Sequence, residues 1–418
     1  MIKISLLLDS EPIIVGHLAA LKNQFYFEYE PSFLNRNLNI SPLKLPLKPG
    51  VFPGSLELPG VFNDSLPDGW GRLLLDRFLL SENILPQSLS LLDRLAYVGK
   101  TGMGALIYEP DKHFSDLYAD HPPLVDLETV EKYTQSILKE KNEDCPQAIF
   151  EQLLALNGSS AGARPKAMIG VNADRSKILL HPSQQNLSMD YESWIVKFRN
   201  TEDSVDAGAI EYVYGLMAKA AGIVMPDIHL FPSKKGPGYF AAQRFDRKQD
   251  QGQEYRIHTH TAAGLLDSDF RIPCLDYDQL MSLAYALSQE VQEVENLFRL
   301  AVFNVLSHNR DDHGKNFTFL MDNNGRWKLS PAYDLSFSFG PQQEHSTMIL
   351  GEGRKPARLL FSLGTKHRLS PQTIHRIFEE TRAALSLFPA LALEFGLSKK
   401  MRTLIQENLL LQISQLQN

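Results

Sequence analysis

The most informative stretch of this 418-residue chain is residues 308–316, which read His-Asn-Arg-Asp-Asp-His-Gly-Lys-Asn and are followed at 333–334 by Tyr-Asp. Apolar residues spaced three or four positions apart precede it and predict a helix: Val294, Phe298, Ala301 and Val305. So many polar and charged groups at the end of an apolar helix form either a solvated turn or a functional site. The spacing of the carboxylates favours the site.

Asp311 and Asn316 have the spacing Asp-x4-Asn of the protein-kinase catalytic loop, with Arg310 directly before the aspartate. Phosphoryl transfer needs a carboxylate that accepts the proton of the attacking hydroxyl, and oxygen ligands that hold magnesium. A second carboxylate, Asp334, follows 18 residues after Asn316, beyond an expected strand–turn–strand at 317–329. This order of an acid, an amide and a distant acid predicts a phosphoryl-transfer site.

A second segment, Gly158-Ser-Ser-Ala-Gly-Ala-Arg-Pro-Lys166, has the composition of a phosphate-binding loop. Its small residues allow the backbone to approach an anion and to turn N–H groups toward it, while Lys166 supplies a positive charge. It is not a Walker A loop, because Gly-x4-Gly-Lys-Ser/Thr is absent. A tight turn between a helix and a strand is the alternative interpretation.

Lys197 lies in an otherwise apolar strand, Trp194-Ile-Val-Lys-Phe198. Strand alternation places Ile195 and Lys197 on one face and the aromatic residues on the other. A lysine in this position must reach water or pair with an anion, because a buried unpaired ammonium group is costly. Glu211, near the start of the next helix, is a candidate partner. The alternative is an edge strand whose lysine extends to solvent.

The rest of the sequence predicts a mixed chain. Strands are expected between Pro and Gly residues at 2–6, 24–29, 168–181, 192–198, 238–245, 317–321 and 327–329. Helices are expected after the possible N-cap Asp68, from Val130, over 209–221 and repeatedly after 278. Because mixed strands lead and helices follow, we expect an α+β chain with two lobes. Residues 113–126, with two adjacent prolines, are a candidate linker.

Composition restricts the class of protein. Hydrophobic residues make up 43% and charged residues 22%, which excludes an intrinsically disordered chain. No apolar run reaches the length of a membrane helix, and we expect no signal peptide. Two cysteines cannot build a disulfide framework, so we expect a cytoplasmic protein of a reducing compartment. The net charge of −7 argues against nucleic-acid binding by this chain alone.

Five motifs together resemble the HipA family of bacterial serine/threonine kinases, which are toxins of toxin–antitoxin pairs. They are Leu-Pro-Asp-Gly-Trp-Gly-Arg at 66–72, the loop at 158–166, Gln-Arg-Phe-Asp-Arg at 243–247, Asn-Arg-Asp-Asp-His-Gly-Lys-Asn-Phe at 309–317 and Pro-Ala-Tyr-Asp at 331–334. The resemblance implies a kinase-like, two-lobed α+β fold with a strand-rich N-terminal region and a mainly helical C-terminal lobe. It implies an N-terminal subdomain at 1–125, the remainder of the N-lobe at 126–247 and the C-terminal lobe at 248–418.

The resemblance also implies roles for residues. Asp311 would be the catalytic base, Asn316 and Asp334 would hold Mg²⁺, and Lys197 would contact the phosphates of ATP with Glu211 in support. The other residues expected around ATP are Ala161, Gly162, Ala163, Arg164, Pro165, Lys166, Gln243, Arg244, Phe245, His313, Gly314, Lys315 and Tyr333. Ser159, with Ser160 as second choice, matches a serine whose autophosphorylation expels the loop and inactivates the enzyme. A phosphate there would compete with those of the nucleotide.

The partners implied are a HipB-like helix-turn-helix antitoxin, operator DNA bound mainly through that antitoxin, and a protein substrate that is an aminoacyl-tRNA synthetase. Arg164-Pro165 replaces the Gln-Glu of the best-known branch, and Gln243 stands where relatives can carry an acid, so the target of another branch is possible. Two alternatives stay open. One is a non-catalytic corepressor. The other is a metal-dependent phosphohydrolase with Asp311, Asp312, His313 and Asp334, and with His258 and His260 as further ligands.

Overall fold

The computed structural model describes residues 1–9, 11–112, 126–139, 147–157, 162–180, 187, 190–250 and 253–416. The chain forms two compact units. Unit 1 comprises residues 1–204, 241–260 and 321–325, and unit 2 comprises residues 205–240, 261–320 and 326–418. The chain passes from one unit to the other within strands β9 (Tyr239–Gln243), β12 (His258–Thr261) and β14 (Thr318–Met321).

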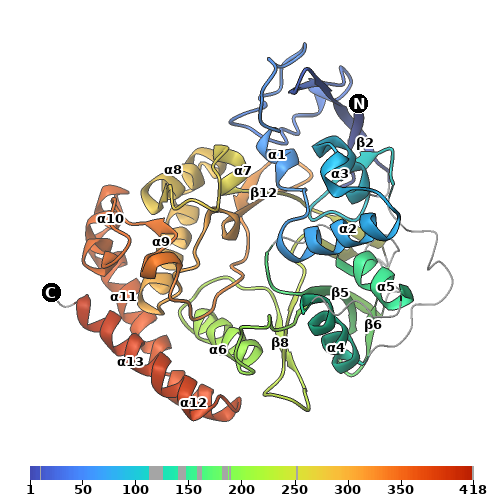
Figure 1. Ribbon diagram of the computed structural model, residues 1–418. Helices are drawn as coiled ribbons and strands as arrows, with labels where there is room; N and C mark the ends of the chain where they lie inside the picture. The colour runs from blue at the N-terminus through green and yellow to red at the C-terminus, as the bar shows by residue number, and fades with distance from the viewer. Residues whose placement is uncertain are drawn as a thin grey trace. The chain divides into compact units, whose positions relative to one another are not determined.

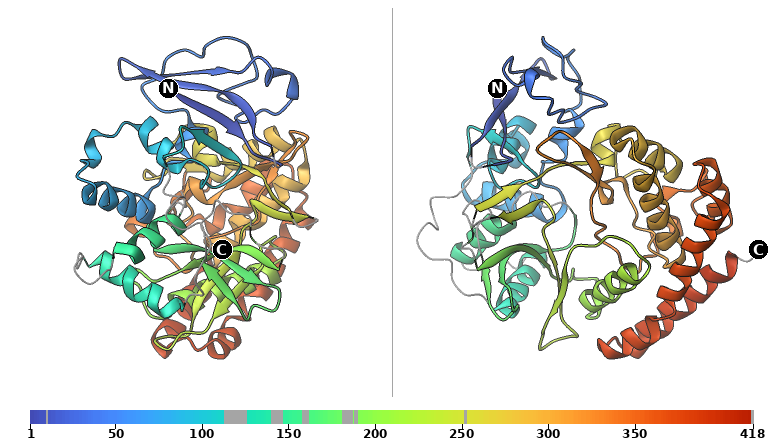
Figure 2. Two further views of the ribbon diagram at one scale, coloured as in Figure 1. Left: turned by 90° about the vertical axis from the view of Figure 1, so that its right-hand side faces the viewer. Right: turned by 180° about the vertical axis from the view of Figure 1, so that it is seen from behind.

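Unit 1 begins with an antiparallel sheet in the order β3-β2-β1-β4 (Figure 2, left). Its strands are β1 (Ile2–Leu6), β2 (Ile13–Leu21), β3 (Gln24–Tyr29) and β4 (Leu106–Glu109). Phe27 and Tyr29 of β3 are buried and pack edge to face, with ring centroids 4.8 Å apart. The helices that follow are α1 (Gly60–Asn63), α2 (Gly69–Ser81) and α3 (Leu91–Val98).

The second sheet of unit 1 carries the phosphate-loop segment. Its strands β5 (Lys166–Asn172), β6 (Ile178–Leu180) and β7 (Tyr191–Lys197) lie in the order β6-β5-β7, with β9 beside β7. Helix α5 (Gln147–Asn157) contacts β5, α2 and α4 (Leu127–Leu138), and Figure 1 shows α2 beside α5. The hairpin of β10 (Arg247–Asp250) and β11 (Gln253–Arg256) precedes β12.

Unit 2 is mainly helical, and its central helix is α9 (Val291–Leu306). Residues 297–306 of α9 are buried on every side, so the segment that follows leaves directly from the core. Helices α6 (Ala207–Ala220), α8 (Tyr277–Ser288), α11 (Pro371–Leu385) and α13 (Lys399–Gln415) supply the surrounding layers (Figure 2, right). The smaller elements are α7 (Ala262–Leu266), α10 (Leu360–Lys366), α12 (Phe388–Glu394), β8 (Ile228–Phe231), β13 (Leu275–Asp276), β15 (Trp327–Leu329) and β16 (Thr347–Met348).

Most elements expected from local patterns are present. Strands β1, β3, β7 and β9 lie at their expected positions, as do the pairs β5–β6 and β14–β15. Helix α6 ends before Gly222, which adopts a left-handed φ of 77°. Strands β2 and β4 and the hairpin β10–β11 were not expected. The candidate linker lies almost wholly outside the described residues, and the division into three domains stays a prediction.

Candidate active site

The segment 308–316 turns sharply out of α9. His308 adopts a left-handed φ of 59°, which ends the helical path. Just before it, Tyr214 donates its hydroxyl hydrogen to the carbonyl oxygen of Ser307 at 2.7 Å. Just after it, the side-chain amide of Asn309 donates to the Asn304 side-chain oxygen at 3.0 Å, back onto the last turns of α9. The position of the segment is therefore fixed by the buried helix.

The adjacent carboxylates Asp311 and Asp312 have opposite environments. Asp311 is exposed, whereas Asp312 is only 1% exposed. Oδ2 of Asp312 accepts from the Tyr277 hydroxyl and lies 2.9 Å from Nδ1 of His345, and Oδ1 accepts from the backbone N–H of Thr347 at 3.2 Å. These bonds fix the backbone of the segment at the buried Asp312, whereas the preceding residue, Asp311, is exposed. From the sequence alone Asp312 is predictable only as a possible metal ligand, because its partners Tyr277, His345 and Thr347 are distant in the sequence.

Hydrogen bonds connect one expected metal ligand, Asn316, and the residue before the other, Tyr333, to the backbone of the 308–316 segment. The side-chain nitrogen of Asn316 donates to the backbone oxygen of Asp311 at 2.8 Å, so its amide oxygen is the atom that a cation would use. The Tyr333 hydroxyl donates to the backbone oxygen of Lys315 at 2.5 Å. The Tyr333 hydroxyl has only one hydrogen, which this bond uses. In its contact with Thr318 the Tyr333 oxygen is therefore the acceptor, and the Thr318 hydroxyl donates to it over 2.5 Å. Asp334 follows Tyr333 directly and has a left-handed conformation with φ of 55°, and its convergence with Asn316 on one metal ion stays a prediction.

Arg310 connects the same segment to the chain that follows Asp334. Its guanidinium donates to the backbone oxygens of Gln343, at 2.5 Å, and Arg354, at 3.5 Å. Its own backbone oxygen accepts from the backbone N–H of Ser346 at 3.1 Å. Together with the bonds that Asp312 makes, these contacts order the chain between 338 and 354.

His313, Gly314 and Lys315 pack against the segment after α7. The Lys315 ammonium lies 4.4 Å from the ring centroid of Phe270, and the His313 ring lies 5.5 Å from it. Gly314 has no room for a side chain, since a Cβ would lie 2.6 Å from Cδ1 of Leu275. The structure thus brings these three residues to one side of the segment. A role for them in nucleotide binding stays a prediction.

The expected phosphate-binding residues belong to unit 1. Lys166 and Lys197 are directly opposite each other on the antiparallel strands β5 and β7. Trp194, Val196 and Phe198 are buried and Lys197 is half-buried, as the alternation predicted. The nearby Arg164 is paired with Asp203 through two bonds of 2.9 and 3.2 Å. Ser159, Ser160 and Ala161 lie outside the described residues.

The expected hinge residues follow this sheet. Gln243 is the cross-strand partner of Trp194, and the backbone N–H of Arg244 donates to the Ser193 oxygen at 2.8 Å. The Arg244 guanidinium is buried and binds both carboxylate oxygens of Asp246, at 2.9 and 2.8 Å. Any contact of residue 244 with a nucleotide would therefore come from its backbone. Glu211 is buried on α6 in unit 2, and its pairing with Lys197 stays a prediction.

The two histidines of the phosphohydrolase alternative have structural partners. Nε2 of His258 lies 2.9 Å from the backbone oxygen of Ile40. His260 lies between Asp64, 2.7 Å from Nδ1, and Ser41, 3.1 Å from Nε2. This resembles the order of a hydrolase triad, but Ser41 is only 1% exposed and cannot meet a substrate. In the described parts of the chain, no group of three or more His, Cys, Asp or Glu side chains could hold a metal.

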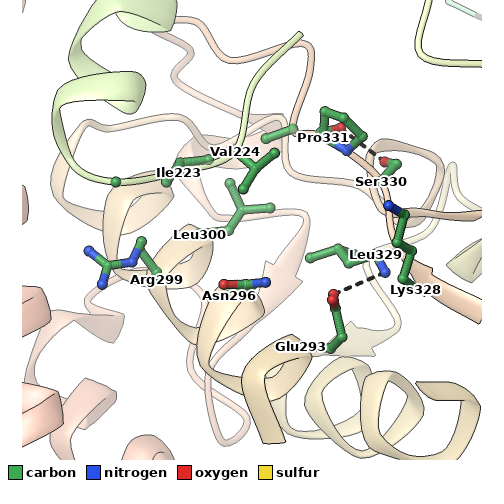
Figure 3. A pocket seen from close by; sticks show the side chains of 12 residues that line it. Ile223, Val224, Glu293, Asn296, Arg299, Leu300, Lys328, Leu329, Ser330 and Pro331 are labelled. Carbon is green, nitrogen blue, oxygen red and sulfur yellow. Dashed lines mark hydrogen bonds between the residues drawn. The ribbon is translucent and has the colours of Figure 1, made fainter. Parts of the chain in front are cut away.

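A pocket of about 150 Å³ lies beside the strand that leads to Asp334 (Figure 3). Its walls come from residues 222–224 after α6, from α9 and from residues 328–332. The Glu293 carboxylate accepts from the Leu329 N–H at 3.1 Å, and the Arg299 guanidinium donates to the Ala221 oxygen at 2.7 Å. Glu293 and Arg299 thus have partners within the protein, and the exposed Lys328 is the other charged side chain in the lining.

Comparison with known families identifies the chain. The family model described as the HipA-like C-terminal domain matches residues 158–387, more than half of the chain, and the one described as the HipA N-terminal domain matches residues 8–109. The chain belongs to the HipA family. The resemblance inferred from its motifs is therefore confirmed.

A solved HipA structure supports the fold of this HipA protein. The HipA chain of the Shewanella oneidensis MR-1 complex of HipA, HipB and operator DNA has a TM-score of 0.70 and 18% identity, covering 100% of this chain and 96% of that one. The Helicobacter pylori proinflammatory kinase CtkA matches with a TM-score of 0.39 and 15% identity, over 55% of this chain and 89% of that one. The Shewanella match confirms the predicted mixed α+β fold, which is the fold of a HipA protein. Among the described residues, no helix is long and apolar enough to span a membrane.

Proposed function

We propose that this HipA protein is an ATP- and Mg²⁺-dependent serine/threonine protein kinase. The observation that carries the proposal is the arrangement at the end of α9. Asp311 is exposed and is followed directly by the buried, hydrogen-bonded Asp312. The Asn316 side chain binds the Asp311 backbone, and Tyr333, the residue before Asp334, binds the Lys315 backbone. A corepressor would need none of these groups.

The residues fit the proposed cofactors. Magnesium prefers oxygen ligands, and Asn316 and Asp334 would supply an amide oxygen and a carboxylate. The bond from Asn316 nitrogen to the Asp311 backbone leaves the amide oxygen for this purpose. In unit 1, two lysines lie directly opposite each other on paired strands and bring two positive charges to one position of the sheet. Lys166 and Lys197 therefore suit the phosphates of ATP.

The chain's own groups then have distinct tasks. The Asp311 carboxylate accepts the proton of the attacking serine hydroxyl, which raises the nucleophilicity of its oxygen. Magnesium, when bound, neutralises charge on the transferred phosphoryl group. Lys166 and Lys197 orient the phosphates, and Asp312 maintains the position of Asp311.

The finer features of the proposal concern partners and regulation. We infer that the chain pairs with a HipB-like helix-turn-helix antitoxin that provides most contacts to operator DNA, in line with this chain's net charge of −7. The Shewanella HipA of similar fold was solved with HipB and operator DNA, which supports the pairing. The proposed substrate is a serine of an aminoacyl-tRNA synthetase. Ser159 is the proposed site of inactivating autophosphorylation.

Incubation with radiolabelled ATP and magnesium tests the kinase proposal. The wild-type protein should label itself, mainly on Ser159, and Asp311→Ala should reduce the rate of labelling at least about 100-fold, because a general base contributes about 10²–10⁴ to such a step. Asp322→Ala, which removes an exposed turn aspartate, is the matched control. Undiminished labelling of Asp311→Ala would exclude Asp311 as the base.

A further inference from the structure

Asp68, Gly69 and Trp70, at the start of α2, contact the phosphate-loop segment. Asp68 occupies the N-cap position, as its sequence context predicts, but its side chain makes no capping bond. Its carboxylate oxygen Oδ1 instead accepts from the backbone N–H of Gly162 at 2.5 Å. The carboxylate is nearly buried, at 9% exposed for the residue. A charged acceptor in such a place makes a strong hydrogen bond.

The contact is reciprocal and tightly packed. The backbone N–H of Trp70 donates to the backbone oxygen of Gly162 at 3.1 Å, so both polar groups of Gly162 are bound to the start of α2. Between these bonds lies Gly69, with a left-handed φ of 44°. A Cβ on Gly69 would lie 2.3 Å from the Gly162 oxygen and 2.5 Å from its carbonyl carbon. Only glycine allows the two backbones to approach so closely.

Gly162 in turn lies beside the cationic side chain of the loop. It has a φ of 106°, and a Cβ there would be 2.9 Å from Nζ of Lys166. Helix α2 also packs on α5, and α5 packs on β5, the strand that begins at Lys166. The start of α2 therefore fixes the backbone at Gly162 while the body of the same helix supports the flanking elements.

We propose that Asp68, Gly69 and Trp70 form a positioning element that holds residues 162–166 ready for nucleotide phosphates. The inference rests on the proposed function, in which Lys166 meets ATP. None of the three residues needs to touch the nucleotide. Because they hold the loop in its ordered conformation beforehand, less conformational entropy is lost when the nucleotide binds. The region matched by the HipA N-terminal domain would thus be part of the nucleotide site's support.

Hydrogen exchange of the ligand-free, full-length protein tests the positioning directly. Asp68→Ala should speed exchange of the Gly162 amide about tenfold or more, because that amide loses a charged acceptor. Asp68→Asn, which keeps an oxygen acceptor, should restore most of the protection. Asp126→Ala, which removes the exposed N-cap acceptor of α4, is the control and should leave Gly162 unchanged. Equal exchange at Gly162 in wild type and Asp68→Ala would overturn the proposal.

Affinity for a non-hydrolysable ATP analogue with magnesium provides the functional measure. Asp68→Ala and Gly69→Ala should each raise Kd, and KM for ATP, about tenfold, with a much smaller change in kcat. Gly50→Ala is matched to Gly69→Ala, since Gly50 also has positive φ, of 88°, but has nothing within 4 Å of a Cβ. Gly69→Ala removes no hydrogen-bonding group and carries the test if Asp68→Ala does not fold.

The outcomes separate this inference from the proposed function. Tighter binding by Asp68→Ala would overturn the inference, because it would mean that Asp68 competes with phosphate for the Gly162 N–H. If the wild-type protein bound no ATP analogue, the proposed function would be wrong. Hydrogen exchange of the Gly162 amide would still decide whether Asp68 positions the loop.

Discussion

His258 is a buried histidine that the fold holds in its neutral form. It is 1% exposed, and its ring nitrogen Nε2 lies 2.9 Å from the Ile40 carbonyl oxygen. Burial lowers the pKa of His258 to about 4 and outweighs the opposite effect of this hydrogen bond. A carbonyl oxygen only accepts, so Nε2 carries the hydrogen of the neutral ring. Acid should therefore weaken unit 1 at this residue.

The sign of the effect follows from the two pKa values of His258. In the unfolded chain His258 binds a proton below its ordinary pKa of 6.5. In the folded chain it stays neutral down to about pH 4. The stabilisation is complete above pH 6.5 and is lost as the pH falls to 4, by about 3 kcal/mol. The slope of the unfolding free energy against pH is proportional to the number of protons taken up on unfolding. His258→Gln should lower that number by about one between pH 4 and 6.5. Denaturant unfolding from pH 4 to 7 measures it, with exposed His375→Gln as control; an unchanged slope would refute the assignment.

At the residue scale, sequence predicts what local spacing encodes. Asp311, Asn316 and Asp334 could be singled out because they share one short region, and Lys197 because its neighbours in the strand are apolar. The functions of Asp68 and Asp312 could not, since their partners lie far away in the chain: Gly162 for the former, and Tyr277 and His345 for the latter. Side-chain direction at such positions is a tertiary property.

At the scale of elements, the segment 308–316 is placed by one buried carboxylate. Asp312 joins it to α8 through Tyr277 and to the chain before and within β16 through His345 and Thr347. Asp312→Ala should lower the unfolding free energy by about 3 kcal/mol, because buried donors lose their acceptor. Chemical denaturation followed by circular dichroism measures the loss.

The neighbouring Asp311→Ala is the natural control for Asp312→Ala. Asp311 is exposed, so its removal should abolish activity and change stability by less than about 0.5 kcal/mol. Asp312→Asn should lie between wild type and Asp312→Ala in stability. Equal stability of the two alanine variants would show that Asp312 does not anchor the segment.

Elements with strong local patterns were predictable, and those defined by partners were not. Helices α6 and α9 have apolar residues at helical spacing, and the Asn323-Asn-Gly turn marks β14 and β15. The hairpin β10–β11 has a polar, charged sequence that gives no strand signal. Its Arg247 and Arg256 are nevertheless buried, because they bind backbone oxygens of the 100–104 loop.

At the scale of the whole molecule, the family matches and the compact units divide the chain differently. Unit 1 contains residues 8–109, matched by the HipA N-terminal domain, and also residues 162–204 of the C-terminal match. A buried charge cluster around Asp246 connects the region matched by the HipA N-terminal domain to the part of unit 1 matched by the C-terminal domain. Asp246 accepts from Arg244, Arg247 and the Gly104 N–H. Burial opposes ionisation of Asp246, but the two arginines outweigh it and hold its pKa far below the usual range.

Tryptophan fluorescence can test whether unit 1 unfolds as one body. Trp70 lies in α2, inside the N-terminal match, and Trp194 lies in β7; both are 1% exposed. Two variants are needed, each with Trp327 replaced by Phe and with a single remaining tryptophan. The one that keeps Trp70 reports on residues 8–109, and the one that keeps Trp194 reports on the second sheet of unit 1. In each background Asp246→Ala should lower the unfolding free energy by the same amount, about 3–5 kcal/mol, since it leaves buried arginines without their carboxylate.

The matched control for Asp246→Ala is Asp76→Ala, which removes a partly exposed carboxylate from Arg94 and should cost about 1 kcal/mol or less. If Trp194 alone reported the effect of Asp246→Ala while Trp70 kept its transition, residues 8–109 would be an independent domain. Their hold on Gly162 would then be a contact between separately stable parts. A common shift would instead mean that the nucleotide loop and the N-terminal sheet share one cooperative core, so that loss of either removes both.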